Sequence, residues 1–480
     1  MARYDQAFTK TSRDAVRYAV RELGRRAGAS ADWIATWRVQ CSNDSVYVYP
    51  ESDSDARIAF PFDPTKPARL AELRMEPPTH YRWMHAPHTS LAETIPDFIV
   101  LFEDQHRDGE ALFEASGERS VQCHADLLTS ALWTLSRMEE IVPLEVDEHG
   151  RFPATASTAY RAGCLDRPIV DECGLAFQQA LLHLFPRWTP PQRPLRVKLS
   201  HDMDRVGIPR RFRTTVGHIY THNMPKAFVR DVLSAVGLGL PAYLQAVLRV
   251  ADTSHTRGLD SAMYWKASGV KSERDTGYDL FHPLIRSTIE RLMDQGFEMG
   301  LHPAYTTFGS NERLSEELST LRKIVGSQPV GGRYHYLRWN PAAWRAWEDV
   351  GLAYDSTLGF ADCIGFRAGT AVPYHPWMIE EDRELAVLEI PLVVMDCTPI
   401  AYMHLDEDQT LRDVDTLIRR CETTGGVFTL LWHNVSVLEQ PYAQLYPRIL
   451  DLLPRNSRYE WKDDLAIGPL PQAVGETMHA

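Results

Sequence analysis

A pair of aspartates two positions apart, Asp202 and Asp204, directly follows an apolar, strand-like run over residues 195–200. Because alternate residues of a strand point to the same side, both carboxylates can face one site. Two carboxylates that lie close together resist joint ionisation unless a cation is beside them. A metal ion bound by one aspartate, with the other accepting a proton, meets this condition. Either aspartate alone could instead cap a loop or a helix, but the pair beside His201 favours a chemical role.

Four further strand-like runs in the second half of the chain also lead directly into residues that can bind a metal or move a proton. The runs are residues 297–301 before His302, 329–332 before Arg333-Tyr334-His335-Tyr336, 352–354 before Asp355, and 426–432 before His433. Because the carboxyl ends of parallel strands share one face, residues far apart in the sequence can converge there. The pattern predicts an enzyme built around one metal ion.

Helical and strand-like segments alternate through this half of the chain. Glycines that can end a helix follow the segments 283–295, 311–325 and 341–350, and apolar residues recur on one face of the second. This alternation predicts an α/β fold in which parallel strands form a barrel or a sheet. Residues 205–275 do not fit the alternation, so we expect an insertion there on the catalytic face.

A proline-rich segment, residues 184–193, separates this half from the N-terminal part of the chain. Prolines stiffen the backbone and interrupt regular structure, and 480 residues exceed what one core usually covers. We therefore predict an N-terminal accessory domain of mixed α/β structure over residues 1–190 and a catalytic domain over residues 191–480.

The composition restricts the location and the partners. A net charge of -13, from 51 basic and 64 acidic side chains, argues against a nucleic-acid partner. The seven cysteines include no C-x-x-C pair, and their odd number argues against a disulfide framework. Residues 1–24 carry charges throughout and lack the apolar centre of a secretory signal, so we expect a cytoplasmic protein.

An apolar run over residues 232–248 is broken by two glycines and a proline, and it is too short to span a bilayer. Basic residues flank it, a pattern that would suit a helix lying on an anionic membrane surface. A helix that covers part of the core is the alternative. Peripheral membrane contact through this run is therefore one of two expectations.

The order of the motifs resembles that of the polysaccharide deacetylases of carbohydrate esterase family four, over residues 195–470. The similar segments are Asp202-Met203-Asp204, Gly300-Leu301-His302-Pro303, Arg333-Tyr334-His335-Tyr336, Tyr354-Asp355-Ser356-Thr357 and Leu431-Trp432-His433. Two upstream segments, residues 136–140 and 167–172, resemble a bacterial two-domain branch associated with surface-polysaccharide synthesis. The order and spacing of the five motifs make the resemblance specific, which no single motif does.

The resemblance implies a distorted (β/α) barrel that removes an N-acetyl group from a sugar of a polysaccharide or glycan precursor. It implies a divalent metal ion, for which we expect zinc. By the same resemblance, Asp204 and His302 bind the metal, Asp202 is the general base and His433 the general acid. Arg333 would orient Asp202, and the backbone N–H near Tyr336 would help to hold the oxyanion.

One departure from the family pattern concerns the metal ligands. The family's second motif carries another histidine four positions after the first, and that position is Thr306 in this chain. A catalytic metal generally needs three protein ligands, so His335, in place of a proline of the third motif, is the obvious substitute. His335 could equally contact the substrate. The departure also makes a catalytically inactive glycan-binding or assembly protein the main alternative function, and a metal-independent glycosidase with paired carboxylates is a third.

Four further residues are candidates for substrate binding. Aromatic faces suit the apolar face of a pyranose, so we expect Trp339 and Trp432 to contact a sugar, together with Asp355 of the fourth motif. Arg367 lies in a glycine-flanked loop and could reach an anionic sugar or a phosphate. Solvation of the arginine at the surface is the alternative.

Overall fold

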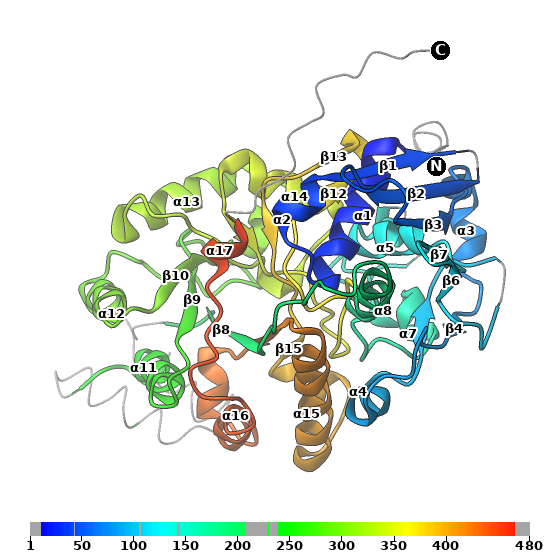
Figure 1. Ribbon diagram of the computed structural model, residues 1–480. Helices are drawn as coiled ribbons and strands as arrows, with labels where there is room; N and C mark the ends of the chain where they lie inside the picture. The colour runs from blue at the N-terminus through cyan, green and yellow to red at the C-terminus, as the bar shows by residue number, and fades with distance from the viewer. Residues whose placement is uncertain are drawn as a thin grey trace.

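The computed structural model describes residues 11–42, 44–104, 107–141, 145–206, 229 and 239–465. The structure is mixed α/β, as predicted, with elements of the first half of the chain gathered on one side (blue to cyan, Figure 1) and those of the second half on the other. Most of the apolar run that could contact a membrane, residues 232–238, lies outside the described residues. So do residues 207–228 of the predicted insertion.

A five-stranded sheet with the order β1-β2-β3-β7-β6 organises the first half of the chain. Its strands are β1 (Trp37–Cys41), β2 (Ser45–Pro50), β3 (Arg57–Pro61), β6 (Phe113–Gly117) and β7 (Ser120–Cys123). Side chains along β2 alternate between half-buried and buried, because one face of the sheet packs on helices. The covering helices include α1 (Arg13–Ala27), α5 (Leu127–Leu135) and α8 (Ile169–Leu184).

A parallel sheet with the order β10-β9-β8-β16-β15 forms the second half. Its strands are β8 (Arg196–Met203), β9 (Ser261–Trp265), β10 (Glu298–Leu301), β15 (Val394–Met395) and β16 (Val427–Leu431). Nearly every residue of β8, β9 and β16 is buried, as expected for parallel strands that are covered on both faces. The carboxyl ends of these five strands therefore lie at the same edge of the sheet.

The parallel pairing continues beyond β10. Leu301 pairs with Gly332, and Gly332 pairs with Asp355 of β11 (Tyr354–Asp355), which in turn pairs with β14 (Leu388–Glu389). Only residues 390–393 separate β14 from β15 along the chain. The Thr429 hydroxyl of β16 fixes this connection, because it donates to the carbonyl of Pro391 and accepts from the amide of Val393.

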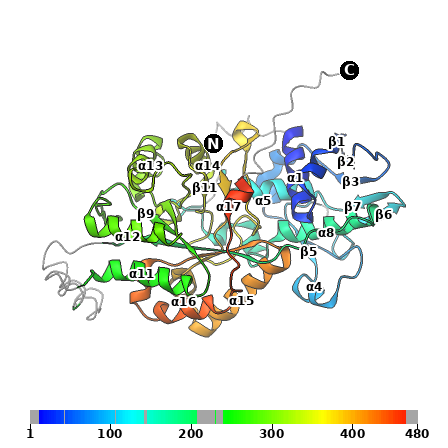
Figure 2. The same cartoon turned by 60° about the vertical axis from the view of Figure 1, so that its left-hand side comes forward.

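Helices lie outside these strands, as Figures 1 and 2 show from two sides. They are α11 (Ala242–His255), α12 (Pro283–Asp294), α13 (Asn311–Val325), α14 (Pro341–Val350), α15 (Glu407–Thr424) and α16 (Tyr442–Leu450). The predicted helices agree with α12, α13 and α14 to within a residue. Helix α14 begins with Pro341 and ends at Gly351, whose φ of 76° is one that glycine adopts without strain.

The described part of the apolar run belongs to helix α11. Its residues Ala242, Leu244, Ala246 and Val247 are buried against the rest of the protein. This part of the run therefore covers the core, which was one of the two expectations. Within the described residues, no helix is long and apolar enough to cross a bilayer.

Buried ion pairs and hydrogen bonds join the two halves of the chain. Glu140, in the first half, accepts hydrogen bonds from Arg137 and from Arg367 of the second half, and all three side chains are almost fully buried. Asp171 on α8 likewise accepts a 2.7 Å hydrogen bond from the backbone amide of Ala371. Arg367, predicted to reach an anionic ligand, is therefore occupied at an internal interface, and that prediction is wrong for this structure.

Replacing Glu140 by alanine should lower the free energy of unfolding by about 3–5 kcal/mol, because Arg367 would stay buried without its carboxylate. Urea denaturation followed by tryptophan fluorescence measures this loss. The matched control is Glu290→Ala, which breaks an ion pair with Arg286 whose two side chains are 51% and 55% exposed. Removal of an exposed pair changes stability by less than about 1 kcal/mol. Equal effects of the two substitutions would contradict the role assigned to Glu140.

Candidate metal centre

Residues at the carboxyl ends of neighbouring parallel strands converge on one small site. Asp202 lies at the end of β8 and Asp204 just beyond it, Lys266 follows β9, and His302 follows β10. The segment after Gly332 supplies Arg333 and His335, β15 leads into Asp396, and β16 leads into Trp432 and His433. This is the convergence that the strand-like runs predicted.

Asp204, His302 and His335 bring three potential ligand atoms together. Asp204 Oδ1 lies 3.2 Å from Nε2 of His302 and 3.2 Å from Nε2 of His335. His302 Nδ1 donates to the carbonyl of Arg333 at 2.8 Å, and His335 Nδ1 lies 2.9 Å from Asp275 Oδ1. Such outer hydrogen bonds fix the orientation of an imidazole and direct its other nitrogen at a metal.

The three residues fit a divalent cation. In the described part of the chain, the buried atoms Asp204 Oδ1 and His302 Nε2 make no well-directed hydrogen bond, although Asp204 Oδ1 forms an ion pair with Lys266. A tetrahedral ion with ligand bonds of about 2.0–2.1 Å separates its ligand atoms by roughly 3.3 Å, close to the two distances of 3.2 Å. Two imidazoles and one carboxylate also form a donor set that suits zinc and other first-row divalent ions.

Charge around Asp204 keeps its carboxylate ionised. Burial favours the neutral acid, but His335, Lys266 and His302 outweigh it and hold the pKa of Asp204 well below its usual range. Burial opposes protonation of His335, yet Asp204 and Asp275 raise its pKa. For His302, burial is the larger effect and lowers the pKa, which favours the neutral ring that a metal requires.

Sequence reasoning missed Lys266 and Asp275. Lys266 Nζ lies 3.0 Å from Asp204 Oδ1 and 3.2 Å from His335 Nε2, and its side chain is 2% exposed. Both residues belong to the stretch assigned to an insertion, whereas Ser261–Trp265 is in fact strand β9 of the central sheet. A short run rich in aromatic and apolar residues is a strand signal that could have shown this.

Arg333 holds the proposed general base. Its Nη1 donates to Asp202 Oδ1 at 3.0 Å, while its Nε and Nη2 bind the carbonyl and the hydroxyl of Ser356 at 2.8 and 3.1 Å. Asp202 Oδ2 lies 3.8 Å from His302 Nδ1, so the base stands beside the ligand cluster. The orienting contact expected of Arg333 is present.

His433 lies on another side of Asp204 and is held by a carboxylate that was not predicted. Its Nδ1 is 2.8 Å from Asp396 Oδ1, its backbone amide donates to Asp396 Oδ2, and its Nε2 is 3.7 Å from Asp204 Oδ2. Burial opposes protonation, but Asp396, Asp204 and Asp202 together raise the pKa of His433 to about 10. The imidazole can therefore carry a proton at neutral pH.

A turn from the first half of the chain reaches the edge of this site. Tyr336, beside His335, has a φ of 63°, a left-handed conformation that is uncommon for a non-glycine residue. Arg151 donates to the carbonyl of Tyr336 at 3.0 Å, and the ring of His149 lies 4.6 Å from the ring of Tyr336. His149 also lies 3.3 Å from the hydroxyl of Tyr305. The N-terminal half thus contacts the segment next to His335.

The structure corrects the expected substrate contacts of Trp339, Trp432 and Asp355, as it does that of Arg367. Trp339 packs on Trp344, and Trp432 stacks on Tyr446; both tryptophans are 1% exposed. Asp355 is fully buried and accepts hydrogen bonds from the amide and hydroxyl of Thr357. Apolar surface buried in the core outweighs sugar stacking as a reason for such aromatic residues.

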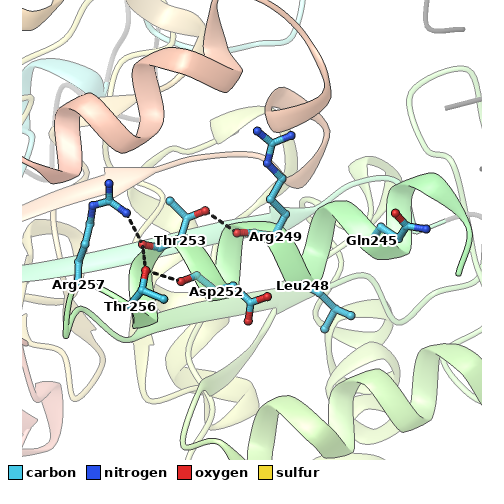
Figure 3. Close-up of a pocket in the computed structure, with 7 residues that line it drawn as sticks. All are labelled: Gln245, Leu248, Arg249, Asp252, Thr253, Thr256 and Arg257. Atoms are coloured by element: carbon cyan, nitrogen blue, oxygen red, sulfur yellow. Dashed lines mark hydrogen bonds between the residues drawn. The ribbon is translucent and has the colours of Figure 1, made fainter. Parts of the chain in front are cut away.

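A separate surface hollow of about 450 Å³ runs along helix α11 (Figure 3). Its lining residues are Gln245, Leu248, Arg249, Asp252, Thr253, Thr256 and Arg257. None of them belongs to the convergent cluster. The hollow is therefore lined by residues other than those of the candidate metal centre.

Comparison with known proteins gives partial likenesses. Residues 71–186 match a family described as one of unknown function (DUF7033), and no curated protein matches the chain. A solved structure named as a polysaccharide deacetylase from Mycobacterium smegmatis is 12% identical with a TM-score of 0.40, over 61% of this chain and 97% of that one. The Puue allantoinase is 14% identical with a TM-score of 0.36, over 55% and 86%.

A third structure, named as a polysaccharide deacetylase from Pseudomonas aeruginosa PAO1, is 14% identical with a TM-score of 0.35, over 58% of this chain and 92% of that one. The chain is thus similar in part to polysaccharide deacetylases and to an allantoinase. At these TM-scores the likenesses carry no chemical conclusion, which depends on the geometry of the site.

Beneath Arg333, Asp355 and Glu389 form a buried acid pair on adjacent strands. Asp355 Oδ2 and Glu389 Oε1 are buried and, among the described residues, have no hydrogen-bond partner. Burial raises the pKa of Asp355 to about 7, and burial together with Asp355 raises the pKa of Glu389 well above its usual value. The native pair therefore holds a proton that the unfolded chain releases above about pH 4.

Because of this proton, the pair lowers the free energy of unfolding as the pH rises from about 4 to about 7. Glu389→Gln removes one acid and keeps an oxygen that can accept the 2.7 Å hydrogen bond from Trp344 Nε1. We expect the variant to lose less stability than the parent between pH 5 and pH 8, as measured by urea denaturation at both values. The exposed variant Glu290→Gln should follow the parent, and a Glu389→Gln curve parallel to it would contradict the shared proton.

Proposed function

We propose that the protein is a metal-dependent hydrolase that removes an N-acetyl group from a sugar of a polysaccharide or glycan precursor. The observation that carries the proposal is the arrangement around Asp204, in which a three-residue ligand cluster lies between an oriented carboxylate, Asp202, and a protonatable imidazole, His433. Amide hydrolysis needs those two proton-transfer groups on either side of an activated water.

We also infer that the parallel strands form a distorted (β/α) barrel over residues 191–480. The continuous pairing from β14 through β11, β10, β9, β8 and β16 to β15 supports this, since residues 390–393 link its two ends. In a barrel, the carboxyl ends of all strands surround one opening, where the active sites of such enzymes lie. The N-terminal residues 1–190 would form the accessory domain of a bacterial two-domain branch of these deacetylases.

A divalent ion held by Asp204, His302 and His335 would polarise the acyl oxygen and increase the acidity of a bound water. Asp202 would accept the proton of the attacking water, because Arg333 holds its carboxylate in place through Oδ1 and its Oδ2 lies beside the ligand cluster, 3.8 Å from His302 Nδ1. His433 gives its proton to the departing amine, and Asp396 keeps the imidazole oriented at 2.8 Å. His433 thus acts in the protonation state that the site favours.

One observation favours the inactive glycan-binding or assembly protein as the second candidate. The ammonium group of Lys266 lies among the ligand atoms, 3.0 Å from Asp204 Oδ1, and its charge opposes the entry of another cation. Metal analysis of protein purified under metal-replete conditions separates the two. A stoichiometric divalent ion supports the enzyme, and its absence supports the binding protein.

Asp202→Asn tests the mechanism, because it keeps the size of the side chain and removes the proton acceptor. We expect release of acetate from N-acetylated oligosaccharides to fall by about 10²- to 10⁴-fold, with the metal content unchanged. The control is Asp279→Asn, an exposed aspartate that caps a turn by accepting from the amide of Phe281. Near-normal turnover by Asp202→Asn on any substrate that the parent cleaves would exclude this base.

A further inference from the structure

Lys266 is placed as part of the ligand cluster itself. Its ammonium lies 3.0 Å from Asp204 Oδ1 and 3.2 Å from His335 Nε2. These distances match the 3.2 Å between Asp204 Oδ1 and each histidine Nε2. The ammonium thus lies about as close to Asp204 Oδ1 as the two histidine nitrogens do, so it is one of the atoms of the cluster.

Two hydrogen bonds hold the backbone of Lys266 beside the segment that carries Asp204. The amide of Lys266 donates to the hydroxyl of Tyr278 at 2.9 Å, and that hydroxyl donates to the carbonyl of Met203 at 2.8 Å. The end of β9 is thereby tied to the segment that carries Asp204. The Lys266 side chain therefore starts beside Asp204, and its ammonium leaves the cluster only if the side chain changes its conformation.

The positive charge of Lys266 balances two carboxylates of the cluster. Asp204 and Asp275 are two carboxylates at a site with little access to solvent, and Lys266 lies within 3.6 Å of both. A buried carboxylate needs a partner cation or hydrogen bonds, because isolation from water is unfavourable. The ammonium of Lys266 is such a cation for Asp204, at 3.0 Å from Oδ1.

We propose that Lys266 is a resident cation that competes with the metal for Asp204. Its ammonium holds Asp204, His335 and Asp275 together in the metal-free protein. A divalent ion binds only when the lysine side chain turns away from Asp204 Oδ1 and His335 Nε2. The inference rests on the proposed function to the extent that it takes Asp204, His302 and His335 as the metal ligands. It assigns to Lys266 the control of metal affinity, a property that the ligands alone do not determine.

The test is the affinity of Lys266→Met for Zn²⁺, measured on the full chain by competition with a chromophoric chelator. Methionine keeps most of the length of the side chain and removes the charge. Because like charges a few ångströms apart repel strongly in a buried site, we expect Zn²⁺ to bind at least about tenfold more tightly than to the parent. The metal-free variant should melt at a lower temperature than the metal-free parent, since Asp204 loses its partner.

Two control variants separate the effect of the Lys266 charge on Zn²⁺ affinity from the effect of removing any buried lysine. Lys198→Met removes another buried lysine of the same sheet, which pairs with Glu298 at 2.8 Å and precedes Asp202 by four residues, about 13 Å along the strand. Its Zn²⁺ affinity should equal that of the parent. Lys266→Arg keeps the charge and should show no gain. If Lys266→Met does not fold, Lys266→Gln, which keeps a donor for Asp204, replaces it with the same expected gain.

The outcomes separate this inference from the proposed function. Tighter binding by the uncharged variants alone supports the competition, and binding by these variants but not by the parent supports it while rejecting metal-dependent activity in the parent. If the parent binds Zn²⁺ and the uncharged variants bind it equally or more weakly, the competition is excluded and the ligand set stands. If neither binds Zn²⁺, the ligand assignment fails and the competition with it.

Discussion

The pairing of carboxylates with cations at the carboxyl ends of the parallel strands is the interaction on which this site depends. Four acidic side chains meet there, and each has a basic partner within 3.2 Å: Asp202 with Arg333, Asp204 with Lys266, Asp275 with His335, and Asp396 with His433. Without these partners the carboxylates would repel one another and lose solvation. The strands bring the charged side chains together, and the ion pairs offset the repulsion between the carboxylates and their loss of solvation.

The first half of the chain has a structural part in this arrangement. Arg367 of the second half is buried against Glu140, and Arg151 holds the carbonyl of Tyr336, the residue next to His335. A left-handed conformation at Tyr336 persists only where neighbouring groups impose it. The N-terminal half therefore fixes the segment that presents His335, in addition to packing on the second half.

Local signals explain what could be predicted from the sequence. A polar residue directly after an apolar run marks a strand end, so the positions of Asp202, Asp204 and His302 followed from neighbouring residues. Partners distant in the sequence carry no such signal. Arg367 resembles a loop arginine until Glu140, 227 positions away, is placed against it. Lys266 follows a strand of five residues that the flanking segments obscured.

Asp275 contacts both His335 and Lys266 and so connects two members of the cluster. Its carboxylate lies 2.9 Å from His335 Nδ1 and 3.6 Å from Lys266 Nζ, and it accepts from the amide of Tyr305 at 3.1 Å. Tyr305 precedes Thr306, where the deacetylase resemblance implies a histidine. The same carboxylate thus binds the segment that contains Thr306 and orients the imidazole of His335. A hydrogen bond of this kind fixes the orientation of an imidazole, so Asp275 directs Nε2 of His335 toward Asp204.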